Sequence, residues 1–305
     1  MSAVEDALLG AAVADLSSWA VLRGTGPAFL PLLHRLSTGE VEKLAPGEGR
    51  PTVVTTPKGR ILARLTVLHF GDAGIFVLAG PGTGARVISH LTKYALGEDI
   101  GLSDVTSSTK VLAVVGPRWT EAAEAMGVPG LASYATATIP DGTRVARTNG
   151  FDDEGLLILS DSTSRDLPRL TAEDFEAWRI LTGRPLAGHE LTEDYNPLEA
   201  GLRDAVSFTK GCYTGQEVVA RLNTYDKVAR EIVRLEIPDG EVPPAGARLV
   251  FGEREAGIVT SAVRDPRGST IAALAYVKKR DLPKGTEVVD IVWDGGKIEA
   301  RIVSR

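Results

Sequence analysis

The sequence has little cysteine and no long apolar run. Its 305 residues include one cysteine, Cys212, so no disulfide can form within the chain, and this is typical of a reducing compartment. No apolar stretch approaches the roughly 20 residues that span a bilayer. The N-terminal segment carries Glu5 and Asp6, whereas the apolar region of a signal peptide lacks acids. These absences predict a cytoplasmic protein without a membrane span.

Positive charge is also in short supply. The chain has 34 Lys and Arg against 40 Asp and Glu, a net charge of −6. Proteins that bind nucleic acid through its phosphates neutralise many of them with Lys and Arg, so we expect no stable nucleic-acid binding. The four histidines lack the close spacing of zinc ligands, and one cysteine cannot supply a ligand pair. We therefore expect no stably bound metal.

What is present includes a duplicated local plan. An apolar run ending near residue 22 leads into Gly26-Pro27 and a helical pattern, and residues 111–115 lead into Gly116-Pro117 and a second helical pattern. Pro27 suits the first position of its helix. Strand-like runs at 52–56, 61–69 and 75–79 lie between the copies. The pattern predicts an α+β region of two similar halves, the second starting near residue 110.

A further helix is predicted in the middle of the chain, since Thr171, with Asp174 three residues later, indicates a capped helix that ends near Gly183.

The last quarter of the chain has a different character. From residue 230 onward, short alternating patterns recur without any helix, which is typical of a small β-barrel or sandwich. We therefore expect one region at residues 1–227 and a β domain at 228–305.

The segment richest in chemistry is K-G-C-Y-T-G-Q-E at residues 210–217, which contains the only thiol. Lys210 close to Cys212 would favour the thiolate and raise its reactivity, so these two residues are the catalytic candidates. The alternative is an inert thiol that packs as a small apolar side chain.

This segment resembles the signature of the YgfZ family of folate-binding proteins, which are relatives of the glycine-cleavage T protein and include iron–sulfur assembly members. Other similar segments follow in the family's order, at residues 36–41 with Gly47, 57–62, 183–185 and 196–202. The resemblance implies a folate-binding region of two ferredoxin-like α+β halves followed by a C-terminal β-barrel. It also implies tetrahydrofolate, or a derivative, in a central channel.

The resemblance places Glu199 against the pterin ring. A carboxylate suits that position because the pterin edge offers adjacent N–H donors that one pair of oxygens can accept. The alternatives for Glu199 are a negative charge at the N-terminus of a helix and a salt bridge to Arg203, four residues on. Arg221 and Arg230 are expected either to hold the anionic glutamyl tail of folate or to form a solvated basic strand edge.

Three further residues of the signature are candidates for the folate site. Tyr213 is expected either to stack on the pterin or to pack in the core. Gln216 and Glu217 are expected to orient the thiol-bearing turn or to cap the strand that follows it.

One departure from the transferase branch decides the expected function. The T protein has an essential aspartate in the strand that matches residues 59–65, where this chain has Ala63-Arg64. The leading expectation is therefore a folate-binding accessory protein that supports iron–sulfur enzymes, with assembly proteins or client enzymes as partners. The alternatives are a folate-dependent aminomethyltransferase or other one-carbon transferase, and a non-catalytic folate-dependent partner in tRNA modification.

Overall fold

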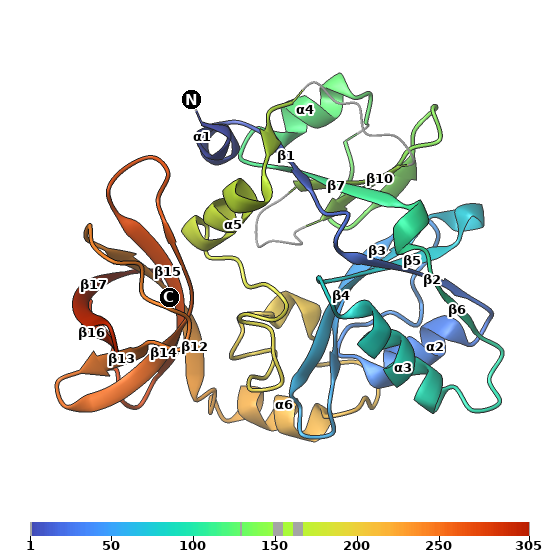
Figure 1. The fold of residues 1–305 in the computed structure, drawn as a ribbon. Coiled ribbons are helices and arrows are strands. Elements are labelled where there is room, and N and C mark those ends of the chain that lie inside the picture. The colour runs from blue at the N-terminus through green and yellow to red at the C-terminus, as the bar shows by residue number, and fades with distance from the viewer. Residues whose placement is uncertain (1, 129, 149–154, 161–166, 305) are drawn as a thin grey trace.

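The structure, a computed structural model, describes residues 2–128, 130–148, 155–160 and 167–304. It contains two α+β halves and a C-terminal barrel, which lie side by side (Figure 1). The expected architecture is confirmed. No helix in the described ranges is long and apolar enough to cross a membrane.

The first half is a five-stranded sheet in the order β3-β4-β5-β2-β6. Two amphipathic helices cover one face, and their apolar sides form a core with that face, for example through Phe29, Leu65 and Val87. The elements are β2 (Ala20–Thr25), α2 (Phe29–Leu36), β3 (Gly49–Thr55), β4 (Ile61–His69), η1 (Gly71–Ala73), β5 (Ile75–Ala79), α3 (Gly84–Tyr94), β6 (Gly101–Asp104) and η2 (Thr106–Ser108).

The second half is a six-stranded sheet in the order β11-β1-β7-β10-β9-β8. Its strand β1 comes from the N-terminus of the chain and pairs with β7, Val13 opposite Val114, so the first residues belong to the second half. The elements are α1 (Ala3–Leu9), β1 (Ala12–Asp15), β7 (Lys110–Val115), α4 (Trp119–Ala125), β8 (Thr136–Thr138), β9 (Arg144–Thr148), β10 (Gly155–Ser160), β11 (Arg169–Leu170) and α5 (Ala172–Leu181).

The repeated Gly-Pro turns occupy equivalent places in the two halves. Gly26 (φ 86°) and Gly116 (φ 110°) both adopt the positive φ that side chains disfavour, and each precedes its helix start by three residues. A Cβ on Gly26 would lie 2.3 Å from the Asp99 carbonyl oxygen. The prediction that Pro27 occupies the first helical position was wrong by two residues, because α2 begins at Phe29.

The C-terminal unit is a closed barrel, whose strand order is β12-β15-β14-β13-β16-β17. Alternate residues of its strands point inward and form a separate apolar core. The strands are β12 (Arg230–Ile237), β13 (Arg248–Phe251), β14 (Arg254–Arg264), β15 (Ile271–Lys278), β16 (Val288–Trp293) and β17 (Gly296–Ser304).

The segment between α5 and the barrel is mostly loop, with η3 (Arg203–Ala205) and α6 (Gln216–Thr224). The predicted capping box of α5, Thr171 with Asp174, is confirmed. A buried ion pair ties α5 to this loop and to the barrel, since Arg179 donates to Glu190 Oε2 at 3.1 Å and to Ser261 Oγ at 2.8 Å. The loop therefore lies at the junction of the three units.

Candidate functional site

Lys210 anchors the K-G-C-Y-T-G-Q-E segment to the first half. Its side chain is buried, and Nζ donates to the carbonyl oxygens of His34 at 2.7 Å, Ser37 at 2.8 Å and Gly39 at 2.6 Å. Burial lowers the pKa of Lys210 to about 8, so the ammonium still carries its charge at neutral pH. Lys210 therefore uses its three donors to fasten the loop after α2.

Cys212 lies two residues further on and is exposed. The sequence left open a buried, inert thiol at this position. The exposure of Cys212 shows that the burial expected in that alternative was wrong. Because the Lys210 ammonium is directed at backbone carbonyls, the geometry shows a clamp for the loop that carries the thiol. The expected activation of Cys212 by Lys210 stays a prediction.

Tyr213 and Thr214 complete the attachment. Tyr213 is buried, burial raises the pKa of its hydroxyl to about 12, and its ring centroid lies 5.3 Å from Lys210 Nζ. Thr55 Oγ1 donates to the Thr214 carbonyl oxygen at 2.6 Å, and the Thr214 N–H donates to the Arg35 carbonyl oxygen at 3.0 Å. Tyr213 therefore packs in the protein interior, and a contact with the pterin stays a prediction.

Gly215 packs closely against the β3–β4 turn. Its φ is +82°, and a Cβ there would lie 2.5 Å from the Thr56 carbonyl oxygen. We expect Gly215→Ala to lower the free energy of unfolding by roughly 2 to 4 kcal/mol, from left-handed backbone strain and a backbone clash. Urea unfolding at 25 °C measures the difference.

Gly211 provides a matched control for this change. It lies in the same loop, is exposed, and has nothing within 4 Å of an added Cβ. Gly211→Ala should change the free energy of unfolding by about 0.5 kcal/mol or less. Equal effects of the two substitutions would show that the loop is not held against the turn as described.

The residues after Gly215 form helix α6, so the expected strand there was wrong. Gly215 in the left-handed conformation starts the helix, and Val219 is its fully buried residue. Gln216 Nε2 lies 3.5 Å from the Gly211 carbonyl oxygen, within reach of the thiol-bearing turn. Glu217 is exposed in the first turn of α6, where its negative charge favours the helix N-terminus.

Glu199 is a buried carboxylate at the three-unit junction. It is 4% exposed, its Oε2 accepts the Asn196 N–H at 3.1 Å, and its own N–H donates to Asn196 Oδ1 at 3.0 Å. Within the part of the chain that the structure describes, Glu199 Oε1 has no hydrogen-bond partner. The reciprocal bonds with Asn196 fix the carboxylate and leave one oxygen free to accept.

The charged partner of Glu199 is Arg60, which the sequence did not identify. Arg60 Nη1 lies 3.4 Å from Glu199 Oε2, whereas the Arg203 guanidinium lies 5.0 Å from the centroid of the Phe208 ring. The expected salt bridge to Arg203 was therefore wrong. Arg60 belongs to the 57–62 segment of the family resemblance, so that motif was the available signal.

Arg230 contacts the same backbone carbonyl oxygen as Arg60. Arg60 Nη1 donates to the Asp194 carbonyl oxygen at 2.8 Å, and Arg230 Nη1 lies 3.4 Å from the same oxygen. The Arg230 guanidinium also lies 5.7 Å from the centroid of the Tyr195 ring, which stacks on Tyr276 of the barrel at 3.4 Å. The structure thus brings Glu199 and Arg230 together, and it leaves Arg221 exposed on α6.

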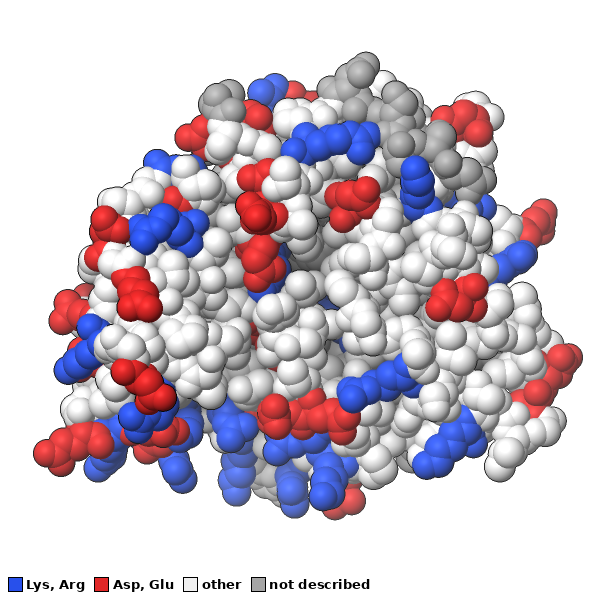
Figure 2. All heavy atoms as spheres, in the orientation of Figure 1, with Lys and Arg blue, Asp and Glu red and all other residues white. Residues whose placement is uncertain are grey.

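The position of the missing carboxylate also faces the junction. Ala63 is buried among the helices of the first half, whereas Arg64 and Thr66 line a small pocket. The opposite wall of this pocket is the loop of residues 185–187 with Leu191. The Arg64 side chain therefore lies on the side of β4 that faces the junction. In the orientation of Figure 1, the surface of the molecule has a hollow near its centre (Figure 2).

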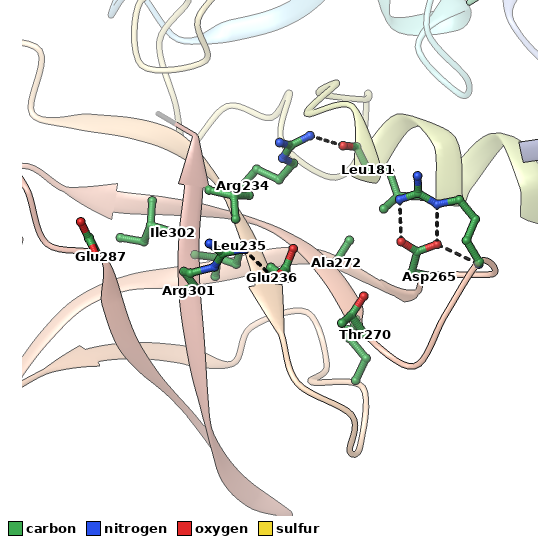
Figure 3. A pocket seen from close by; sticks show the side chains of 13 residues that line it. Leu181, Arg234, Leu235, Glu236, Asp265, Thr270, Ala272, Glu287, Arg301 and Ile302 are labelled. Atoms are coloured by element: carbon green, nitrogen blue, oxygen red, sulfur yellow. Dashed lines mark hydrogen bonds and ion pairs between the residues drawn. The ribbon is translucent and has the colours of Figure 1, made fainter. Parts of the chain in front are cut away.

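A cavity of about 590 Å³ lies elsewhere, between α5 and the barrel. Its arginines are paired: Arg301 donates to Glu236 at 2.8 Å and Arg267 donates to Asp265 at 2.7 Å. Arg234 donates to the Leu181 carbonyl oxygen, as Figure 3 shows. None of the site residues expected from the sequence lines it. Size alone therefore does not identify the site.

One group of three described residues has metal-ligand chemistry: His34, Glu40 and Glu42, whose ligand atoms lie within 4.8 Å of one another. The His34 Nδ1 accepts the Glu42 N–H at 3.3 Å, and burial, followed by the Lys210 charge, lowers the pKa of His34. A histidine nitrogen already in use and a lysine ammonium nearby disfavour a cation here. The expectation of no stable metal stays a prediction.

Comparison with known proteins agrees with this architecture. Residues 4–128 match the GCVT N-terminal domain, and residues 230–305 match the glycine cleavage T-protein C-terminal barrel domain. The chain therefore belongs to the glycine-cleavage T-protein-like family.

Individual relatives cover nearly the whole chain. An Arabidopsis thaliana protein named "Putative transferase", chloroplastic, is 29% identical over 92% of this chain and 68% of its own length. The aminomethyltransferase of Streptomyces coelicolor is 28% identical over 91% of this chain and 81% of its own length. The crystal structure of aminomethyltransferase T from Bartonella henselae has the same fold, with a TM-score of 0.81 at 21% identity, over 99% of this chain and 87% of that one.

Proposed function

We propose that the protein binds tetrahydrofolate or a derivative, with Glu199 accepting hydrogen bonds from the pterin ring. The observation that carries the proposal is the buried Glu199 carboxylate, which Asn196 orients and whose Oε1 has no partner among the described residues. A carboxylate oxygen that is held in place and has no protein donor is available to accept a ligand N–H. Arg60 and Arg230 beside it suit the carboxylates of a folate tail.

Anaerobic titration of the wild-type protein with tetrahydrofolate tests this proposal. At about a hundred times its dissociation constant, a ligand that binds only the folded state raises the free energy of unfolding by roughly 2.7 kcal/mol. Urea unfolding with and without tetrahydrofolate should show this increase, together with saturable heat in calorimetry. No heat and no change in stability would overturn the proposal.

One use of the bound folate is one-carbon transfer. The named relatives are aminomethyltransferases or a transferase, which favours a folate-dependent transferase for this chain too. Against aminomethyl transfer stands the chain itself, since Ala63 is buried and Arg64 supplies a cation where the family's transferases have a carboxylate. An assay for methylenetetrahydrofolate from an aminomethylated lipoyl carrier decides: turnover establishes the transferase.

The other use is the accessory role of YgfZ-like proteins in iron–sulfur enzyme assembly or repair. Its support is Cys212, exposed on a loop that Lys210 and Thr214 fasten to the first half. A single thiol cannot hold a cluster that needs four ligands, so partner proteins would have to supply the others. In cells that lack the protein, wild type should restore iron–sulfur enzyme activity and Cys212→Ser should fail at equal abundance. Full restoration by Cys212→Ser would remove the thiol role.

A further inference from the structure

Tyr276 is a barrel residue whose side chain packs against the candidate site. On β15 its neighbours Ala275 and Val277 belong to the apolar core inside the barrel, so Tyr276 points to the opposite face of the strand. It is nevertheless only 1% exposed. It packs in a separate apolar cluster that includes Ile61 of β4 and Leu202 of the loop before α6. The barrel therefore places an aromatic side chain at the junction of the three units.

The Tyr276 side chain contacts the loop of residues 185–196 at two points. Its ring stacks on the ring of Tyr195, with 3.4 Å between the centroids and 11° between the planes. Its hydroxyl donates to the Glu190 carbonyl oxygen at 3.0 Å. Burial raises the pKa of Tyr276, so the hydroxyl stays protonated at neutral pH and keeps this donor role. One side chain of the barrel thus holds two points of the loop that leads to Glu199.

The Glu190 point is held by other groups as well. The side chain of Glu190 is fully buried, its Oε1 accepts the Ser261 hydroxyl at 2.7 Å, and its Oε2 accepts the Leu186 N–H at 3.0 Å. Arg179 of α5 donates to the same Oε2 at 3.1 Å. Because these bonds remain when the Tyr276 hydroxyl is removed, the hydroxyl contributes only part of the attachment at this point.

The Tyr195 point leads directly to the buried carboxylate. Tyr195 precedes Asn196, whose N–H donates to Glu199 Oε2 at 3.1 Å and whose Oδ1 accepts the Glu199 N–H at 3.0 Å. The Tyr195 carbonyl oxygen accepts the Ile61 N–H at 3.0 Å. This bond fixes the backbone of Tyr195 to β4, and the stack with Tyr276 fixes its ring to the barrel. The position of Asn196, and with it that of the Glu199 carboxylate, therefore depends on the Tyr276 ring.

We propose that Tyr276 is a positioning residue for the folate site: its ring fixes Tyr195 and, through Asn196, the Glu199 carboxylate that accepts the pterin N–H groups. The inference rests on the proposed function. Because Tyr276 is 1% exposed, it acts without touching the ligand. A carboxylate that is already held in place loses less freedom when the ligand binds, so the stack raises the affinity. The barrel thereby takes part in folate binding.

The test measures the dissociation constant of tetrahydrofolate, by anaerobic calorimetry, for full-length wild type, Tyr276→Leu and Tyr276→Phe. Leucine keeps the side chain apolar and removes the flat ring, so we expect the dissociation constant to rise at least about tenfold. Phenylalanine keeps the ring and loses only the hydroxyl, so the dissociation constant should stay within about threefold of wild type. If Tyr276→Leu does not fold, Tyr195→Leu breaks the same stack from the loop and should give the same increase.

A double-mutant cycle separates this role from a merely structural one. Tyr276 acts through Glu199, so Tyr276→Leu/Glu199→Gln should bind tetrahydrofolate within about twofold of Glu199→Gln alone. A rise of the same size in both backgrounds would overturn the proposal, because the two residues would then act independently. Wild-type affinity in Glu199→Gln would overturn it as well, since the carboxylate through which Tyr276 acts would not be used.

Ile291→Ala is the control for a general loss of barrel stability. Ile291 is fully buried in the barrel core on β16, which pairs with β13 and β17 and lies on the side of the barrel away from the loop (Figure 1). This variant should lower the urea midpoint of unfolding and leave the dissociation constant within about twofold of wild type. An equal rise in Ile291→Ala, or wild-type binding in Tyr276→Leu, would overturn the inference and leave the folate site intact. Absence of tetrahydrofolate binding to wild type would remove the folate site itself.

Discussion

Lys210→Met should lower the free energy of unfolding by about 3 to 5 kcal/mol, because it leaves three buried carbonyl oxygens without a donor. The three oxygens belong to His34, Ser37 and Gly39, at the end of α2 and the loop after it, more than 170 residues away in the chain. Methionine keeps the length of the side chain and cannot replace an ammonium. Urea unfolding at pH 7, where the wild-type ammonium is charged, measures the loss.

Lys58→Met is the matched control for this substitution. It removes the same charge from an exposed side chain of the β3–β4 turn, so the free energy of unfolding should change by about 0.5 kcal/mol or less. One ordinary hydrogen bond contributes roughly 1 kcal/mol to stability. If the free energy of unfolding of Lys210→Met lies within about 1 kcal/mol of the wild-type value, Lys210 does not hold the loop in the way described.

The second large effect concerns binding. Glu199→Gln keeps the shape of the side chain, and its amide oxygen can still accept the Asn196 N–H. The amide NH₂ then meets the donors of the pterin edge, and two donors cannot bond each other. We expect the dissociation constant of tetrahydrofolate to rise at least about 30-fold, the equivalent of one lost charge-assisted hydrogen bond of roughly 2 kcal/mol.

Glu193→Gln is the control for this variant, because Glu193 is an exposed glutamate of the same loop that pairs with Arg86 at 3.1 Å. It should bind tetrahydrofolate as wild type does. Unchanged binding in Glu199→Gln, with wild-type stability, would mean that tetrahydrofolate does not use this carboxylate.

Local sequence patterns were enough to predict the repeated halves and an all-β C-terminal domain, and the family resemblance selected a barrel over a sandwich. Strands of the barrel alternate inward and outward residues, and the Gly-Pro turns recur at fixed distances from their helices, so each signal is contained within a few residues. The helix α6 was missed because Val218 and Val219 favour a strand in isolation. The start of α6 is instead set by Gly215, whose conformation depends on the distant turn at Thr56.

Contacts between distant segments could not be predicted. Strand β1 pairs with β7 and so joins the N-terminus to the second half, and no local sequence pattern predicts this pairing. The candidate site shows the same limit: Glu199 was identified through a motif, but its partner Arg60 lies 139 residues away. Lys210 was expected to act on Cys212, two residues along the chain, and the structure directs its ammonium to carbonyls of the first half.

The most direct test of the folate site is a crystal structure of the protein grown anaerobically with tetrahydrofolate. The account predicts pterin density at the junction of the three units, with ring N–H groups about 2.7 to 3.2 Å from the Glu199 carboxylate oxygens. Pterin density confined to another place, such as the cavity that Arg234 and Arg301 line, would contradict it.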